Sequence, residues 1–132
     1  MKIFIAYRYR DTEKVEIRKN VEAVSNGLKI AGHIPFIFAR DVQKWGEAHM
    51  TLPEIIKRAF EEIDASDAVL AFIDSDEKSE GALMEIGYAY ARGKKVIAYI
   101  KKGLRYSFVR GIASKTIEFD TVDGSDLNVI IP

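Results

Sequence analysis

The sequence contains no cysteine and only two histidines, His33 and His49. Without cysteine the chain can form no disulfide, and it can supply neither a thiolate metal ligand nor a thiol nucleophile. The two histidines lie far apart and do not have the spacing of metal ligands, so we expect no metal site. Nothing in the sequence implies an organic cofactor.

The sequence also lacks an excess of charge, because 20 basic and 20 acidic residues balance to a formal net charge of zero. No basic surplus is present to attract a nucleic-acid polymer. No apolar run reaches the roughly 18 residues of a membrane-spanning helix, and residues 1–7 are too short and too alternating for a signal peptide. We expect a cytoplasmic protein without nucleic-acid or membrane partners. Its neutrality favours self-association through an apolar patch.

What the sequence does contain is a regular alternation of strand and helix patterns. Its length predicts one domain over residues 1–132. The expected strands cover residues 2–7, 34–38, 68–73, 95–100 and 116–119, and the expected helices cover residues 15–31, 51–65, 81–92 and 106–113. Asp11 or Thr12 is the expected N-cap of the first helix. Residues 39–50 have no clear period and should form a loop or a broken helix, whereas residues 127–131 form an apolar tail that should dock on the body or on a partner.

This alternation predicts an α/β fold of the flavodoxin-like or Rossmann-like type, a three-layer sandwich with a mostly parallel sheet of about five strands. Right-handed crossovers place the carboxyl ends of all strands at one edge, where ligands bind. That edge should receive residues 7–11, 38–46, 74–79 and 101–106.

One carboxylate stands out on the predicted helix 81–92. Ala82, Glu85 and Ala89 share one helical stripe, so Glu85 should project from a face that is otherwise small and apolar. Partial burial would raise the pKa of Glu85, and the nearby helix N-terminus would lower it. The alternative is a surface glutamate paired with Arg92 or Lys94.

The residues around Glu85 form a motif with defined spacing. It consists of Ser66-Asp67, Ser79-x-Gly81, Glu85-x-Gly87-x-Ala89 and Gly93-Lys94. This motif resembles the nucleoside 2-deoxyribosyltransferase family, which includes the 2′-deoxynucleoside 5′-phosphate N-hydrolases. The resemblance implies that Glu85 is the nucleophile, which attacks the anomeric carbon of the deoxyribose and forms a glycosyl-enzyme. Water or a second base then resolves that intermediate.

The resemblance also implies binding roles for neighbouring residues. Ser79 would contact the sugar or place the glutamate, and it can cap the following helix at the same time. Gly81, beside the stripe, would let the substrate approach the helix closely. Ser107 resembles a residue that reaches a neighbouring subunit's pocket in the hydrolase branch, where it could touch a 5′-phosphate; a helix cap is the alternative. The implied assembly is a homodimer or larger homo-oligomer, and the implied partner is a small nucleoside or nucleotide.

The sequence departs from the family pattern at three places. The first strand of the family usually ends in a glycine-containing turn, whereas residues 6–10 here contain no glycine. An aspartate that usually lies eight residues before the Asp67 position is Ala59 here. The tyrosine that often steers the nucleophile from the first strand aligns with Phe4. Tyr7, at the pocket mouth, or Tyr9 could take its place. These departures leave open whether the pocket supports turnover.

The polar residues after the first and third strands allow two interpretations each. Arg8, at the pocket mouth, and Arg10 could bind a phosphate bidentately, or they could be solvated charges that face Asp11 and Glu13. Asp74 could supply a second carboxylate to the site, or it could be a solvated loop aspartate.

A second resemblance leads to an alternative function. Residues 3–7, followed by Arg10 and Asp11, resemble the opening of a TIR domain, as does a serine six residues before a glutamate. Some TIR domains cleave the N-glycosidic bond of NAD with a glutamate, and others only assemble with partner TIR domains. We predict cleavage or transfer at the N-glycosidic bond of a 2′-deoxyribonucleoside or its 5′-monophosphate. The alternative is a non-catalytic nucleotide-binding or TIR-like module.

Overall fold

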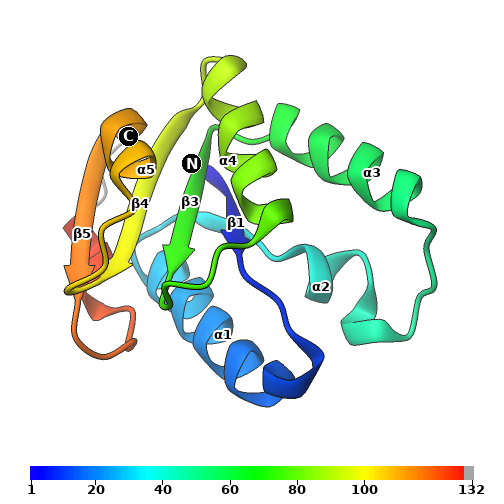
Figure 1. Ribbon diagram of the computed structural model, residues 1–132, viewed down its shortest axis with the longest axis horizontal. Coiled ribbons are helices and arrows are strands. Elements are labelled where there is room, and N and C mark those ends of the chain that lie inside the picture. The colour runs from blue at the N-terminus through cyan, green and yellow to red at the C-terminus, as the bar shows by residue number, and fades with distance from the viewer. Residues whose placement is uncertain (130–132) are drawn as a thin grey trace.

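The computed structural model describes residues 1–129, and it contains a five-stranded, all-parallel sheet with helices on both faces (Figure 1). The strand order is β2-β1-β3-β4-β5. The strands are β1 (Lys2–Tyr7), β2 (Ile34–Phe36), β3 (Ala68–Ile73), β4 (Lys95–Lys101) and β5 (Lys115–Phe119). The helices are α1 (Lys14–Ile30), α2 (Phe38–Asp41), α3 (Leu52–Asp64), α4 (Glu80–Ala91) and α5 (Ser107–Ile112), with short 3-10 helices at η1 (Asp11–Glu13), η2 (Lys44–Gly46) and η3 (Ser125–Val129). The predicted three-layer α/β fold is confirmed.

The sheet separates two hydrophobic layers (Figure 1). On one face, α1 and η3 pack against strand residues such as Ile5 and Leu70, and on the other face α3, α4 and α5 pack against Phe4 and Val69. All six residues of β3 are buried, because helices cover both faces of this central strand. Among residues 1–129, no helix is both long and apolar enough to span a bilayer.

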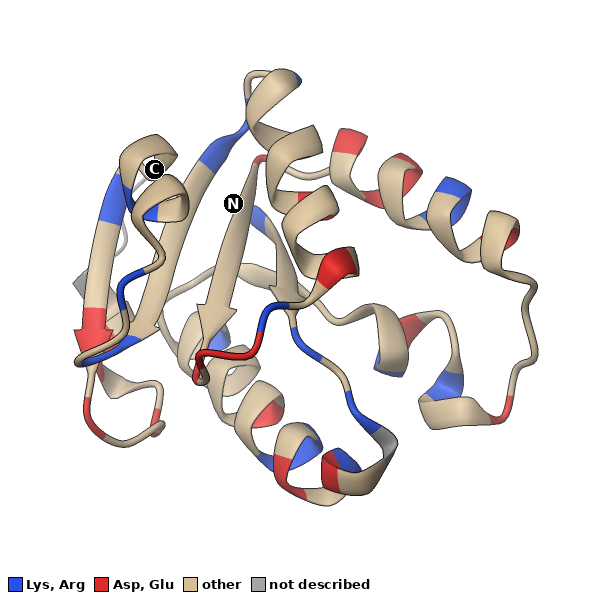
Figure 2. Ribbon diagram, in the orientation of Figure 1, with Lys and Arg blue, Asp and Glu red and all other residues tan. Residues whose placement is uncertain are grey.

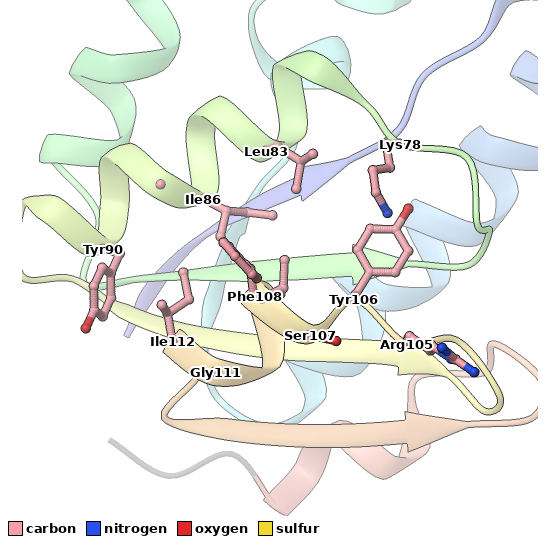
Figure 3. A pocket seen from close by; sticks show the side chains of 12 residues that line it. Lys78, Leu83, Ile86, Tyr90, Arg105, Tyr106, Ser107, Phe108, Gly111 and Ile112 are labelled. Atoms are coloured by element: carbon pink, nitrogen blue, oxygen red, sulfur yellow. The ribbon is translucent and has the colours of Figure 1, made fainter.

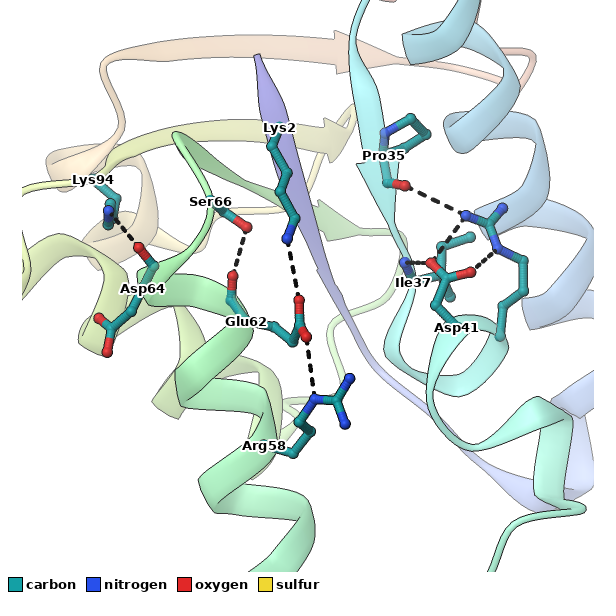
Figure 4. Close-up of polar contacts among 10 residues, drawn as sticks. Lys2, Pro35, Ile37, Asp41, Arg58, Glu62, Asp64, Ser66 and Lys94 are labelled. Carbon is teal, nitrogen blue, oxygen red and sulfur yellow. Dashed lines mark hydrogen bonds and ion pairs between the residues drawn. The ribbon is translucent and has the colours of Figure 1, made fainter.

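Local signals fix the position of α3 and α4. Thr51 and Glu54 form a reciprocal capping box at the start of α3. At the other end of α3, the side chain of Asp64 accepts hydrogen bonds from Tyr88 Oη (2.8 Å) and Arg92 Nε (2.9 Å). The Asp64 carbonyl accepts another from Lys94 Nζ at 3.0 Å (Figure 4). These contacts hold the C-terminal end of α4 against the end of α3.

Two local predictions were wrong. The residue that caps α1 is Glu13, without a side-chain capping bond, because η1 occupies the preceding turn where Asp11 or Thr12 was expected to cap. The second strand ends at Phe36 instead of residue 38, because Phe38 already begins α2.

The irregular segment after β2 is a broken helix, as predicted. It contains α2 and η2, which are separated by a turn, and Lys44 and Trp45 have positive φ angles of 51° and 56°. A network holds α2 in place. Asp41 accepts a hydrogen bond from the Ile37 backbone N–H at 2.9 Å (Figure 4). Arg40 donates hydrogen bonds to Asp41 and to Glu22 of α1. The segment is therefore anchored to α1 despite its irregular backbone.

The chain after β5 returns across α1. Leu127 is fully buried in the α1 layer, and the Tyr99 hydroxyl donates a hydrogen bond to Asp126 at 2.8 Å. Gly27 and Gly124 meet so closely that a Cβ on Gly27 would lie 2.3 Å from the Gly124 carbonyl oxygen. The predicted docking of the apolar tail is thus confirmed for Leu127, while residues 130–131 lie outside the described residues.

Candidate active site

A cavity of about 380 Å³ lies where the end of β1 meets the α2–η2 segment and the first turns of α4. Three of the four segments that were predicted at this edge contribute to it. The lining residues are Phe4, Ile5, Tyr7, Tyr9, Phe38, Ala39, Gln43, Trp45, Gly46, Ser79, Gly81, Ala82 and Glu85. The lining of this cavity is therefore mostly apolar and aromatic, with five aromatic side chains and a single charged residue.

The charged residue is Glu85, which α4 delivers to the cavity one turn after Ala82. Burial raises the pKa of Glu85 from its ordinary value of 4.5 to about 8, and no hydrogen bond or ion pair with residues 1–129 offsets this effect. Arg92 and Lys94 both interact with Asp64. The alternative of a surface glutamate paired with Arg92 or Lys94 is therefore contradicted.

Tyr7 faces the same cavity from the end of β1. Burial and then the negative charge of Glu85 raise the pKa of Tyr7, while the backbone N–H of Ala39 opposes the shift. Tyr7 therefore keeps its proton at physiological pH and is available as a donor beside Glu85. Phe4 also lines the cavity, but its ring carries no donor.

Ser79 and Gly81 lie at the start of α4, and both line the cavity. The Ser79 Oγ accepts a hydrogen bond from the Ala82 backbone N–H at 3.1 Å, so Ser79 is the N-cap of α4. A Cβ on Gly81 would meet no atom within 4 Å, which leaves open space in front of this turn. Contact of either residue with a sugar stays a prediction.

The sequence of residues 4–125 matches the family model of nucleoside 2-deoxyribosyltransferase. The chain belongs to this family. A search of curated proteins found no match.

Solved structures show the same fold. A CMP N-glycosidase from Clostridium botulinum shares 19% identity over 98% of this chain and 100% of its own, with a TM-score of 0.72. A 2-deoxyribosyltransferase from Bacillus psychrosaccharolyticus shares 19% identity over 99% of this chain and 93% of its own, with a TM-score of 0.76. A conserved protein from Enterococcus faecalis V583 has a TM-score of 0.70 at 18% identity, covering 96% and 94% of the two chains.

Three residues that were predicted to bind substrate lie outside the cavity of this family member. Arg8 hydrogen-bonds Glu13 at 2.7 Å and lies 3.5 Å from Glu77 and 4.0 Å from Asp74, while Arg10 pairs with Glu77. Figure 2 shows this acidic segment before α4 beside the basic residues that follow β1. The structure thus favours the interpretation of Arg8 as a charge that faces Glu13, and it places Asp74 beside Arg8 and away from Glu85.

Ser107 is the third of these residues. It begins α5 and lines a separate apolar groove of about 810 Å³ between α4 and α5. Figure 3 shows Leu83, Ile86 and Tyr90 on one side of this groove, opposite Phe108 on the other. In the described chain, Ser107 and Glu85 therefore belong to different surface depressions.

Ala59, which stands where the sequence comparison expected an aspartate, is a buried core residue in this structure. Ala59 is 3% exposed, belongs to the core between α3 and the sheet, and does not line the cavity. Glu85 is therefore the single carboxylate among the described residues that line the cavity.

Sequence reasoning missed Phe38, Gln43 and Trp45 as cavity residues. The available signal was the position of residues 38–46 after a strand, together with an aromatic content unusual for an irregular segment.

Among residues 1–129, no cluster of three His, Asp or Glu side chains is arranged to hold a metal ion.

Proposed function

We propose that the protein cleaves or transfers at the N-glycosidic bond of a 2′-deoxyribonucleoside or its 5′-monophosphate, with Glu85 as the nucleophile. Family membership supports an N-glycosidase or deoxyribosyltransferase activity in general. The observation that carries the finer proposal is the lone, unpaired carboxylate in an aromatic cavity at the strand ends. A strongly perturbed acid in such a place is a candidate for covalent catalysis.

In the first step, the ionised Glu85 carboxylate attacks C1′ of the sugar as the bond from C1′ to the base nitrogen breaks. The base leaves with the electron pair and takes a proton from solvent water, and a glycosyl ester remains on Glu85. In this proposal Tyr7, whose pKa responds to the charge of Glu85, donates a hydrogen bond to the Glu85 carboxylate and orients it. Water or a second base then attacks C1′ and restores the carboxylate.

The charges around the cavity favour a nucleoside over a nucleotide. No Lys, Arg or His among the described residues lines the cavity, and Arg8 and Arg10 are engaged by Glu13 and Glu77. A 5′-phosphate would need a cation or several donors from elsewhere to offset its desolvation. We therefore expect the chain to use a deoxynucleoside better than the corresponding 5′-monophosphate, in contrast to a relative that acts on CMP.

The same proposal includes a homodimer formed through the groove between α4 and α5. Phe108 on one wall is 91% exposed, and Tyr90 and Met84 of α4 are exposed as well. The groove shares Leu83, Ile86 and Tyr106 with a smaller depression that reaches Ser79, so a second copy seated there would approach the start of α4. We expect Phe108→Glu to yield monomers in sedimentation velocity, whereas Ile30→Glu, at an equally exposed apolar position on α1, should leave a dimer intact.

The activity is tested by incubating the protein with deoxynucleosides, their 5′-monophosphates, CMP and NAD, followed by chromatography for free base. We expect base release from deoxynucleosides, its loss in Glu85→Gln, and its retention in Glu80→Gln, which changes an exposed carboxylate on the same helix. Mass spectrometry should detect a deoxyribosyl adduct on Glu85. Saturable binding without release from any compound would support the non-catalytic module, and release from NAD alone would support TIR-type chemistry.

A further inference from the structure

Trp45 forms part of the wall of the Glu85 cavity, and the proposed catalytic groups do not explain its presence there. It lines that cavity and also a smaller one of about 210 Å³, which Arg18 lines but Glu85 does not. Trp45 therefore stands between the two spaces. It is also the only tryptophan of the chain.

The backbone that carries Trp45 is held in an unfavourable conformation. Lys44, Trp45 and Gly46 have consecutive positive φ angles of 51°, 56° and 100°. A bulky residue in the left-handed region costs free energy, and such residues persist where the surrounding structure holds them, often at ligand sites. Here the Gln43 carbonyl accepts hydrogen bonds from the N–H groups of Gly46 (3.0 Å) and Ala48 (3.1 Å), which closes the turn.

The indole is held from outside the cavity as well. The guanidinium carbon of Arg18, on α1, lies 4.5 Å from the centroid of the Trp45 ring, within the range of a cation–π contact. Arg18 belongs to the lining of the smaller cavity alone. Arg18 thus contacts the Trp45 ring from the smaller cavity, and the same ring forms part of the wall of the Glu85 cavity.

We propose that Trp45 is the binding residue that receives the planar base of the substrate by stacking, and that Arg18 is its positioning residue. This inference rests on the proposed function for the identity of the ligand, a purine or pyrimidine nucleoside. An aromatic wall suits such a ligand because every base presents a π face, and stacking does not require a particular pattern of donors and acceptors. The surrounding residues Tyr9 and Phe38 add further aromatic surface to the same cavity.

Because Trp45 is the only tryptophan, its fluorescence reports on this wall directly. The Glu85→Gln variant, which binds without turnover, is titrated with 2′-deoxyadenosine, thymidine and 2-deoxyribose, and calorimetry measures the binding independently. We expect saturable quenching by both nucleosides and none by the base-free sugar. Nucleoside binding that calorimetry detects without any change in the emission of Trp45 would overturn the inference.

Kinetics on the otherwise wild-type protein give the second readout. Trp45→Ala should raise KM on the order of 10- to 100-fold, the loss expected for one stacked base, with little change in kcat. Trp45→Phe should lose less, since it retains an aromatic face. Circular dichroism and thermal melting of both variants establish that the fold is retained. An unchanged KM in folded Trp45→Ala would overturn the role of Trp45 and leave the proposed activity standing.

The role of Arg18 is tested with matched changes on α1. Arg18→Ala should raise KM and alter the emission maximum of Trp45, Arg18→Lys should restore part of both properties, and Lys29→Ala, at the exposed end of the same helix, should change neither. Equal behaviour of Arg18→Ala and Lys29→Ala would refute the positioning role. Quenching by nucleosides in a protein that releases no base would instead retain the inference and refute the proposed catalysis.

Discussion

The Tyr7 hydroxyl, at the end of β1, lies close enough to Glu85 on α4 for the negative charge of the glutamate to raise the pKa of the tyrosine. Burial acts in the same direction on both groups, raising the pKa of Tyr7 and that of Glu85. The cavity therefore holds two acids that resist ionisation, and only the glutamate can ionise near neutral pH. That difference supports the proposed roles, in which Tyr7 donates a hydrogen bond and Glu85 accepts it.

Removal of the Tyr7 hydroxyl should weaken catalysis while leaving the cavity intact. We expect Tyr7→Phe to lower kcat by about 10- to 100-fold, the effect of one lost hydrogen bond to a charged group. The pH profile should also move to higher pH, because the Glu85 carboxylate loses a donor. Steady-state assays of base release measure both effects. Tyr90→Phe, at an exposed position of α4 outside the cavity, serves as the control, and equal rates for the two variants would count against this role.

The activity should depend on pH through Glu85. The proposed nucleophile is the Glu85 carboxylate, and burial raises the pKa of this group to about 8, so the proposed active form accumulates as pH rises. We expect kcat/KM to increase about tenfold for each pH unit below pH 8 and to level off above it. Measurement between pH 5 and 9.5 tests this expectation. A profile that is flat from pH 5 upwards would mean that Glu85 ionises normally in the free protein.

The raised pKa of Glu85 should increase activity as pH rises, but it should lower the stability of the folded protein over the same range. The folded protein binds a proton on Glu85 between about pH 4.5 and pH 8 that the unfolded chain has released, so the free energy of unfolding falls as pH rises through this window. Glu85→Gln removes this dependence. We expect the variant to exceed the native chain by about 3–5 kcal/mol at pH 8.5 and to equal it near pH 5. Urea unfolding at both pH values provides the test, and a constant difference would be inconsistent with it.

The regular elements were predictable from the sequence because each carries its own local signal. The continuous apolar run of β3 reflects burial on both faces, and the Thr51 capping box marks the start of α3. Glu85 was found because a carboxylate among small residues conflicts with the helical pattern around it. In each case, the information lies within a few residues of the element.

The remaining part of the site depends on contacts between distant segments. Trp45 reaches the cavity through a left-handed turn, and Arg18 of α1 contacts its ring; neither the turn nor the contact follows from local periodicity. The place of Arg8 likewise depends on Glu77, which lies far along the chain. Sequence reasoning found the segments at this edge, but it could not determine which side chains share a cavity.

Arg8 should therefore matter for stability and not for phosphate recognition. Its side chain is 13% exposed and lies among Glu13, Asp74 and Glu77, so Arg8→Ala leaves three carboxylates without their shared cation. We expect the melting temperature to fall by about 3–8 °C. The ratio of kcat/KM for a deoxynucleoside and its 5′-monophosphate should not change. A selective loss of activity on the monophosphate would instead identify Arg8 as a phosphate ligand.

The contact between Gly27 and Gly124 should be intolerant of any side chain. A Cβ on Gly27 would lie 2.3 Å from the Gly124 carbonyl oxygen, and the backbone of both segments would have to move. We expect Gly27→Ala to lower the free energy of unfolding by about 1–3 kcal/mol, as overpacking does in a well-packed interior. Gly87→Ala, also within a helix but with no atom within 4 Å of the added Cβ, should raise it by about 0.5–1 kcal/mol. Chemical denaturation of both variants gives the comparison. Similar stability of the two would show that the turn before η3 does not approach α1 as closely as this contact requires.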